Sequence, residues 1–379
     1  MTISKYSFGV GDRFAHEAVN QLKALIKVEH DFGVRFAPVW NKSNREHTII
    51  GTDPMSTRIQ ADAAVKKLGY EGEYYCDADH INMTNVDKFI DACDFFTLDV
   101  ADYIGKSGTR EERYLPAVRK AAECYRYIAS KKGEGNFVTE VSMDEVDEPQ
   151  TPEDIKYILT QIANEKIPAQ TFAPKFTGRF NKGVDYVGDL AAFEKEFEED
   201  LKAIEWARNE LDLPKNLKLS IHSGSDKFSI YPIMGRLLKK YDQGIHIKTA
   251  GTTWLEEIIG LAVASDEALA MAKRIYSSAY ARREELAKPY ATVIDIDVAS
   301  LPTPEEVDNW SADTFARTLR HDQSDEKYNS SFRQLMHVSF KVAAELGEEY
   351  LNQLEKNADV IGEQISANIC DRHVARLFR

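Results

Sequence analysis

The chain has 379 residues, a hydrophobic content of 43% and a formal net charge of −14. This length suits one large α/β domain with additions, or two domains. The negative charge argues against binding to nucleic acid or to anionic membranes, and no apolar run approaches the roughly 20 residues that span a bilayer. An anionic ligand would therefore need a local group of cations.

The cysteines and the N-terminal residues indicate the cellular compartment. The four cysteines are scattered along the chain and form no CxxC pair: Cys76, Cys93, Cys124 and Cys370. The chain begins without the apolar segment that is typical of a secretion signal. We therefore expect a cytoplasmic protein with reduced thiols.

Eight predicted strands alternate with predicted helices through the first 265 residues. The clearest strand covers residues 217–222, where Leu217, Leu219 and Ile221 alternate with polar residues. The strands are expected at residues 8–13, 34–40, 73–80, 95–99, 136–145, 169–176, 217–222 and 243–251. The helices are expected at residues 14–28, 53–68, 84–92, 111–129, 152–163, 189–211 and 232–240, and from residue 253 onward. This alternation predicts a (β/α)8 barrel, also called a TIM barrel.

The rest of the chain is predicted to be helical. Residues 269–288, 311–320, 328–345 and 350–378 carry apolar side chains at intervals of three and four, which is typical of helices with one buried face. We expect two parts, a catalytic barrel at residues 1–265 and a helical extension at residues 266–379 that packs on the barrel.

Histidines and carboxylates follow several of the predicted strands, where barrel enzymes place their active sites. His80, His222 and His246 come from the third, seventh and eighth strands. Imidazoles that converge with carboxylates favour a divalent metal, so these three residues are predicted metal ligands. Glu140 lies within a strand, where an ionised carboxylate is costly unless it is paired or bound to metal. Asp144 and Glu145 are expected to be solvated in the loop that follows.

Cations gather near the ends of the sixth and eighth strands. Lys175 ends the sixth strand, Arg179 and Lys182 follow in its loop, and Lys248 lies in the eighth strand. In an acidic chain these residues are candidates to bind a substrate carboxylate, although Arg179 and Lys182 are equally compatible with ordinary surface charges. The candidate substrate-binding set also includes residues after the first and seventh strands: Asp12, Arg13, Asp226 and Lys227. Asp12 could instead cap the first helix.

A set of sequence strings resembles a known family. From Phe8 into the C-terminal helices, the chain is similar to the tagaturonate/fructuronate epimerases of bacterial hexuronate catabolism. The resemblance rests on the strings FGVGDR, DADH, TEVSMDE, KGVDYVGDL, HSGSDKFSIYP, HIKTAGTTWLE and RQLMHVSF, which occur in this order. Some members of the family carry an additional N-terminal region, which we expect this chain to lack. This difference bears on regulation and on the formation of a homo-oligomer, and the oligomeric state stays open.

The resemblance implies an isomerase that acts on a small sugar acid and depends on a divalent metal, with zinc, manganese or nickel expected. It implies Asp79 as the proton acceptor, Glu140 as the proton donor, and His80 and His222 as metal ligands. His246 is a further ligand inferred from its strand, and Glu140 could instead share the metal.

The chemistry of such an epimerase restricts its mechanism. Tagaturonate and fructuronate differ at C4 of the ketose, which is β to the ketone and is not acidified by it. Retro-aldol cleavage, rotation of the aldehyde and re-addition would invert this carbon, with one acid, one base and a Lewis-acidic metal. Transient oxidation by a nicotinamide would require a dinucleotide motif, and GVGDR lacks the full GxGxxG pattern.

Two other functions stay open at this level. A metal-dependent sugar isomerase or aldolase on the same barrel would use the same ligands. A non-catalytic sugar-binding barrel would show no metal and no turnover, and the many titratable groups at the strand ends argue against it.

Overall fold

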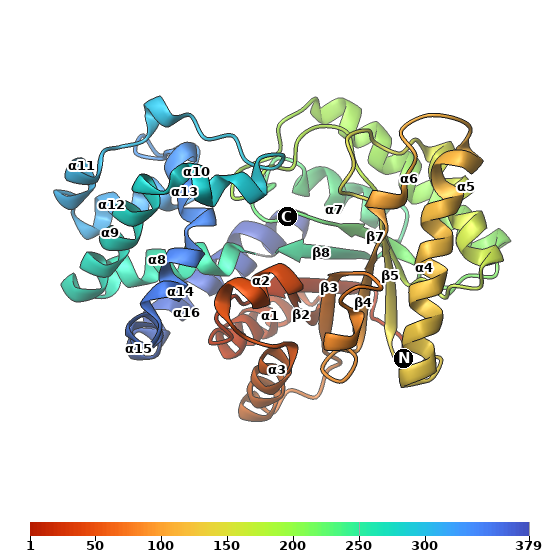
Figure 1. The fold of residues 1–379 in the computed structure, drawn as a ribbon, viewed down its shortest axis with the longest axis horizontal. Coiled ribbons are helices and arrows are strands. Elements are labelled where there is room, and N and C mark those ends of the chain that lie inside the picture. The colour runs from red at the N-terminus through yellow and green to blue at the C-terminus, as the bar shows by residue number, and fades with distance from the viewer. Residues whose placement is uncertain (250, 379) are drawn as a thin grey trace.

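Eight parallel strands form a closed barrel in the computed structural model, which describes residues 1–249 and 251–378 (Figure 1). Each strand pairs with the next along the chain, and β8 closes the barrel on β1. The strands are β1 Tyr6–Gly11, β2 Ala37–Ser43, β3 Tyr75–Ile81, β4 Phe95–Asp99, β5 Val138–Ser142, β6 Thr171–Ala173, β7 Lys218–Ile221 and β8 Ile245–Thr249. The predicted TIM barrel is confirmed. Ala250, in the predicted eighth strand, and Arg379, in the predicted extension, lie outside the described residues.

Helices cover the outside of the barrel between the strands. They are α1 Ala18–Phe32, α2 Asn44–Ile50, α3 Pro54–Leu68, α4 Arg110–Lys132, α5 Pro152–Asn164, α6 Leu190–Glu210, α7 Tyr231–Lys240 and α8 Thr252–Ala264, with the 3₁₀ turns η1 Val86–Lys88 and η2 Ala101–Tyr103. Several begin with a side-chain cap, such as Asp53 with Pro54 in α3 and Thr151 with Pro152 in α5.

One predicted helix is shorter than expected, and one observed helix was not predicted. The helix expected at residues 84–92 is only the short turn η1, because the Asn82 side chain accepts hydrogen bonds from Thr84 and competes with helical pairing. The unpredicted helix α2 begins with a capping box, in which the Ser43 hydroxyl accepts from the Glu46 amide and the Glu46 carboxylate accepts from the Ser43 amide.

The barrel interior changes from apolar to polar along its axis. A small apolar cluster made of Ile3, Ala37, Val39, Tyr75, Phe95 and Val138 fills the end where the strands begin. Further along the strands, Asp77, Thr97, Glu140 and Lys248 contact one another across the interior. Polar side chains thus lie inside the barrel near the carboxyl ends of the strands, where barrel enzymes place their chemistry.

A bundle of helices extends the barrel on one side (Figure 1). It comprises α9 Asp266–Ala281, α10 Arg283–Ala287, α11 Pro304–Asp308, α12 Ala312–Leu319, α13 Ser330–Val338, α14 Phe340–Leu346, α15 Glu348–Lys356 and α16 Ala358–Ser366, with the 3₁₀ turns η3 Lys288–Tyr290 and η4 Val298–Ser300. None of the helices in the described ranges is both long and apolar enough to cross a membrane.

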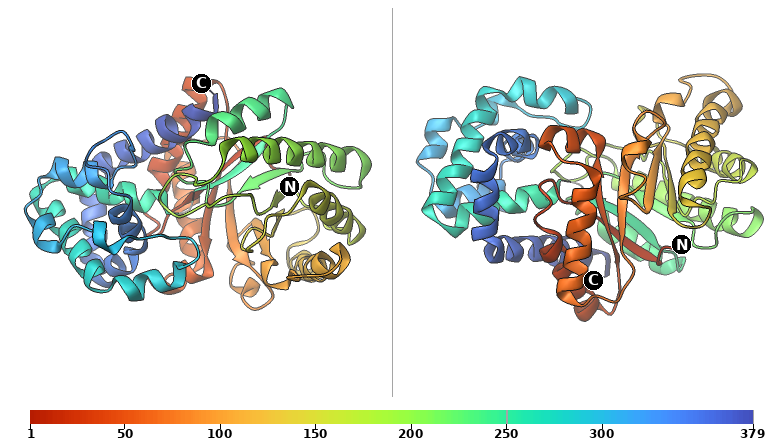
Figure 2. Two further views of the ribbon diagram at one scale, coloured as in Figure 1. Left: turned by 90° about the horizontal axis from the view of Figure 1, so that it is seen from above. Right: turned by 60° about the horizontal axis from the view of Figure 1, so that its bottom comes forward.

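The last part of the chain returns to the barrel. The π-helical segment η5 Ala367–Val374 packs on α1, and α17 Ala375–Phe378 packs on α7 (Figure 2). A Cβ atom at Gly235 of α7 would lie 1.9 Å from the Leu377 carbonyl oxygen, so this close approach requires glycine. One apolar core contains buried residues of the barrel and of the extension. The predicted boundary at residues 265 and 266 coincides with Ser265, which caps α9, and as a division into domains it stays a prediction.

Candidate active site

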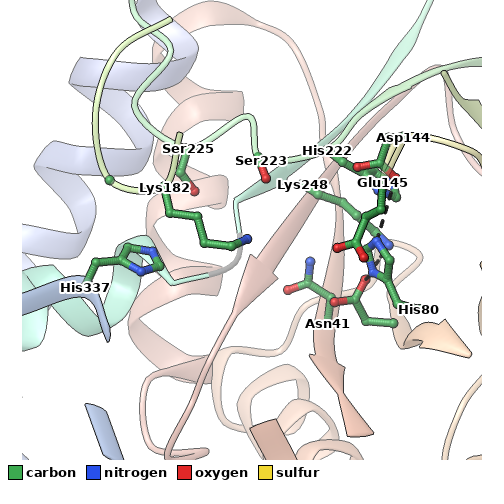
Figure 3. A pocket seen from close by; sticks show the side chains of 12 residues that line it. Asn41, His80, Asp144, Glu145, Lys182, His222, Ser223, Ser225, Lys248 and His337 are labelled. Atoms are coloured by element: carbon green, nitrogen blue, oxygen red, sulfur yellow. Dashed lines mark hydrogen bonds and ion pairs between the residues drawn. The ribbon is translucent and has the colours of Figure 1, made fainter. Parts of the chain in front are cut away.

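Two adjoining cavities open at the carboxyl ends of the strands. The inner cavity, of about 60 Å³, is lined by Asn41, Asp79, His80, Asp144, Glu145, Lys182, Gly183, His222, Ser223, Ser225, Lys248 and His337 (Figure 3). The outer cavity, of about 440 Å³, shares seven of these residues: Asp79, His80, Asp144, Glu145, Lys182, His222 and Ser223. A volume of several hundred Å³ is ordinary for a small-molecule site.

Three side chains in the inner cavity have the geometry of a metal site. His80 in β3, Asp144 after β5 and His222 after β7 each place one ligand atom within 4.8 Å of the others. Nδ1 of His222 lies 2.9 Å from Oδ1 of Asp144, and Nε2 of His80 lies 3.8 Å from the same oxygen. Nε2 of His80 is buried and makes no hydrogen bond among the residues described. A buried, unpaired nitrogen is costly, so these donors fit a divalent cation.

A second carboxylate supports each of the two histidines on its other ring nitrogen. Nδ1 of His80 lies 2.9 Å from Oδ1 of Asp79, and Nε2 of His222 lies 2.7 Å from Oε1 of Glu140. Carboxylates of this kind fix the orientation of metal-binding imidazoles. They leave Nε2 of His80 and Nδ1 of His222 directed at Asp144.

The electrostatics of this group favour a positive charge. Burial lowers the pKa of His222, but Asp144 and Glu140 outweigh burial and raise this pKa to about 9. Burial likewise opposes charge on His80, but Asp79 and Asp144 hold the pKa of His80 well above its usual value. The surrounding carboxylates therefore stabilise either bound protons or a bound cation at this point.

A buried lysine holds the two supporting carboxylates in place. Nζ of Lys248 lies 2.7 Å from Asp77, 2.7 Å from Asp79 and 3.2 Å from Glu140. Burial opposes ionisation of Asp79 and Glu140, but Lys248 and the adjacent histidines hold the pKa of both carboxyl groups well below the usual value. Burial raises the pKa of Asp77 to about 7 despite Lys248. Asp79 and Glu140 are thus held ionised.

The two predicted proton-transfer residues differ in their access to the cavities. Asp79 lines both cavities, whereas Glu140 is fully buried and lines neither. Glu140 contacts the site through His222, so its geometry is that of a residue that positions an imidazole.

The structure does not bring His246 to the other two histidines. His246 is fully buried, its Nδ1 lies 2.9 Å from the Ser7 hydroxyl, and its ring packs on Phe95. Burial lowers the pKa of His246 to about 3. His246 and Lys248 share a face of β8, but a strand rises about 6.6 Å over two residues, which places His246 deeper in the barrel. Asp144, which was expected to be solvated, takes the third position of the group.

Some of the predicted substrate-binding cations line the cavities. Lys248 lines the inner cavity, Arg13, Lys175 and Arg179 line the outer one, and Lys182 lines both. Arg179 is exposed and pairs with Asp295 at 3.1 Å. Arg13 is buried and pairs with Glu46.

Three of the predicted substrate-binding residues point elsewhere. Asp12 accepts hydrogen bonds from the backbone amides of His16 and Glu17, which precede α1, so it orders the turn before the helix and does not cap the helix itself. Asp226 has a φ of +62° and turns its carboxylate to Arg333, 2.9 Å away. Lys227 donates to carbonyl oxygens of the loop before α6. Their carboxylate and ammonium groups are therefore occupied within the fold.

Several residues that line the inner cavity were not predicted from the sequence to belong to the site. Asp144 and Glu145 lie in a loop beyond the strand, and His337 lies in the helical extension. The signal for His337 was present in the string RQLMHVSF, which carried no assigned role. His80 and Ser223 have φ values of +53° and +49°, and strained backbone of this kind is often found at functional sites.

The fold and the cavity define a (β/α)8-barrel enzyme with a candidate metal site at the carboxyl ends of its strands. The chain belongs to the tagaturonate epimerase family, whose model matches residues 1–116 and 110–377. The family predicted from the sequence strings is thus confirmed, and its relatives are epimerases, which are isomerases.

Two relatives illustrate the similarity. The chain is 27% identical over 415 residues to the tagaturonate/fructuronate epimerase of Thermotoga maritima, covering 97% of this chain and 80% of that one. It matches the glycerol-complexed crystal structure of a fructuronate-tagaturonate epimerase from Cohnella laeviribosi with a TM-score of 0.83 and 20% identity, covering 100% and 82% of the two chains. The second comparison shows the shared fold.

Proposed function

We propose that the protein is a metal-dependent epimerase that interconverts D-tagaturonate and D-fructuronate by inverting C4 of the ketose. The observation that carries this proposal is the arrangement of His80 and His222, each supported by a carboxylate and directed at Asp144. Membership of the family and the activities named for its relatives supply the substrate.

His80, Asp144 and His222 would hold the metal. Two nitrogen donors and one oxygen donor suit zinc, manganese or nickel. When bound, the metal supplies Lewis-acid stabilisation of negative charge on a substrate oxygen. The outer cavity gives a sugar acid access to the same residues.

Retro-aldol chemistry inverts C4 without an oxidant. The C4 hydroxyl loses its proton, the C3–C4 bond breaks, and the electron pair moves toward the C2 carbonyl, which gives an enediolate and an aldehyde. The aldehyde then turns its other face to the enediolate, the C3–C4 bond forms again, and the new C4 oxygen takes a proton. The net reaction neither gains nor loses atoms or electrons.

Asp79 is the proposed proton acceptor, because it lines both cavities and Lys248 helps to keep it ionised. Glu140 was predicted as the second proton-transfer group. Since it lines neither cavity and lies 2.7 Å from Nε2 of His222, we assign it a positioning role through His222. Glu145, whose side chain lines both cavities, offers a carboxyl group for the second proton transfer.

Metal analysis of the purified protein followed by incubation with D-tagaturonate tests the function. Bound divalent metal and formation of D-fructuronate are expected. Failure of the metal-loaded protein to form fructuronate would reject the proposal, and faster turnover of a neutral ketose would favour a sugar isomerase or aldolase.

Substrate that carries deuterium at C4 tests the mechanism separately. Retro-aldol cleavage moves no hydrogen bound to C4, so the label should stay in place and the rate should show no primary isotope effect. A primary effect would indicate hydride transfer, and exchange of the label with solvent would indicate direct deprotonation. The cytoplasmic location, the absence of nucleic-acid and membrane partners, and the homo-oligomer stay predictions.

A further inference from the structure

We propose that His337 of α13, together with Lys182, forms the subsite that receives the carboxylate of the sugar acid. This inference rests on the proposed function in one respect, namely that the substrate is a sugar acid. It makes the helical extension a part of the active site.

His337 reaches the inner cavity from the extension. Its side chain lies at the end of this cavity away from His80 and Asp144 (Figure 3). The residue is only 2% exposed, and Nδ1 has no hydrogen-bond partner in residues 1–249 and 251–378. Burying an unpaired imidazole nitrogen costs free energy, and the ring itself lines the cavity, so the ring is a candidate to contact a bound ligand.

Two glycines make room for the imidazole. A Cβ atom at Gly251 would lie 2.6 Å from Nε2 of His337, and one at Gly183 would lie 3.4 Å from its Cδ2. Both glycines have positive φ values, +89° and +76°, a conformation that other residues rarely adopt. The loops after β6 and β8 are thus shaped around this ring.

Lys182 supplies a cation between His337 and the candidate metal ligands (Figure 3). Its backbone is fixed, because its amide donates to the Val293 carbonyl at 2.8 Å and its carbonyl accepts from Gln334 of α13. Its ammonium group forms no hydrogen bond or ion pair within the described parts of the chain, whereas the guanidinium groups of Arg13 and Arg179 have carboxylate partners. Burial lowers the pKa of Lys182, so a bound carboxylate would stabilise its charged form.

The charges around the cavity orient a sugar acid. Asp79, Asp144 and Glu145 line the end near the candidate metal, where a substrate carboxylate would be repelled. At the other end, the ammonium group of Lys182 provides a positive charge that attracts a carboxylate.

The carboxylate subsite also fixes the reacting carbon. In a hexuronate, C4 is separated from the carboxylate carbon by C5 alone. A carboxylate held by Lys182 and His337 therefore directs C4 toward Asp79, whose side chain lines the same cavity. Orientation of this kind is a large part of enzymatic rate enhancement.

Binding of D-tagaturonate and of neutral D-tagatose to the metal-loaded full chain tests the subsite. Isothermal titration calorimetry would compare the wild type with His337→Gln and Lys182→Met, and kcat and KM would be measured on the same samples. Each change should weaken tagaturonate binding about 10- to 100-fold, as for a lost charge-assisted hydrogen bond, and should leave tagatose binding and metal content nearly unchanged. Lys341→Met, which removes an exposed ammonium of α14 paired with Glu285, is the matched control.

Several outcomes would overturn the subsite. Equal losses for both sugars, or an unchanged ratio of their affinities in Lys182→Met, would reject it even if His337→Gln fails to fold. If Lys175→Met loses affinity for tagaturonate as selectively and as strongly as Lys182→Met does, the carboxylate binds in the outer cavity instead. A wild type that binds tagaturonate in this selective way without epimerising it would instead reject the proposed function.

Discussion

The barrel and the helical extension each contain a charge network around a buried cationic side chain, and the two networks are built differently. In the barrel, Lys248 contacts three carboxylates, Asp77, Asp79 and Glu140. In the extension, Arg333 contacts one carboxylate, Asp226, and donates to the carbonyl oxygens of Gly183 and Leu319.

This difference separates a functional network from a structural one. The barrel network has more carboxylates than cations, and two of its carboxylates support the histidines that face Asp144. The Arg333 network is balanced and ties the loops after β6 and β7 to α13. Burial makes either kind of charge costly unless it is paired. We therefore expect changes in the barrel network to alter metal binding and turnover, and changes in the Arg333 network to alter stability.

The largest effect on metal binding and turnover is expected for His222→Ala. Removing a ligand and the partner of Glu140 should strip the bound metal and abolish turnover. Metal content is measured on the purified variant. His246→Asn provides the control, because His246 packs among Ser7 and Phe95, and this variant should keep its metal. A full metal complement in His222→Ala would show that the metal lies elsewhere.

The second effect distinguishes the two carboxylates that support the histidines. Asp79→Asn should still bind metal and, at saturating metal, should lower kcat by about 10² to 10⁴, the usual contribution of an acid or base, beyond any loss of metal affinity from its contact with His80. Glu140→Gln should weaken metal affinity by about 10- to 100-fold, as expected for a residue that orients a ligand. Metal titration and steady-state kinetics measure both quantities. A purely kinetic defect in Glu140→Gln would restore its direct role in proton transfer.

The third effect concerns the Arg333 network. Arg333→Met leaves Asp226 buried without its partner and should lower the free energy of unfolding by about 3–5 kcal/mol. Asp226→Asn added to this variant should recover part of the loss. Urea denaturation measures the change. Arg274→Met, at an exposed ion pair with Glu349, should leave the midpoint unchanged, and an equal loss in both variants would contradict the special role of Arg333.

The smallest effect is a dependence of stability on pH at the contact between the barrel and the extension. Burial, together with the nearby charge of Asp12, raises the pKa of Glu17 to about 8, and burial with Glu17 raises that of Glu257. Between pH 4.5 and 8 the folded state therefore keeps protons that the unfolded state releases, so stability falls as pH rises through this window.

In Glu17→Gln the free energy of unfolding should fall less as pH rises, by up to a few kcal/mol. This is roughly the free energy that corresponds to the shift in the pKa of Glu17. Thermal or urea unfolding at pH 5 and at pH 8 measures it. An identical pH dependence in the wild type and in the variant would show that Glu17 ionises normally in the folded protein.

Local patterns along the chain are enough to predict the architecture and much of the chemistry of this protein. Alternating patterns such as Leu217, Leu219 and Ile221 identified the strands, because a strand side chain repeats its direction every two residues. Eight such strands separated by helices leave few alternatives to a barrel. The same pattern placed Asp79, His80 and His222 at one end of the fold, and the ordered strings identified the family.

Which of these side chains meet depends on how the chain folds and packs. His246 shares its strand face with Lys248, but two residues of strand rise carry it away from the cavity, while the loop after β5 brings Asp144 in. His337 is separated from His222 by more than a hundred residues and reaches the same cavity because α13 packs against the loops around Gly183 and Gly251. Depth along a strand and contacts between distant segments depend on the closed barrel and its packing, which no local pattern encodes.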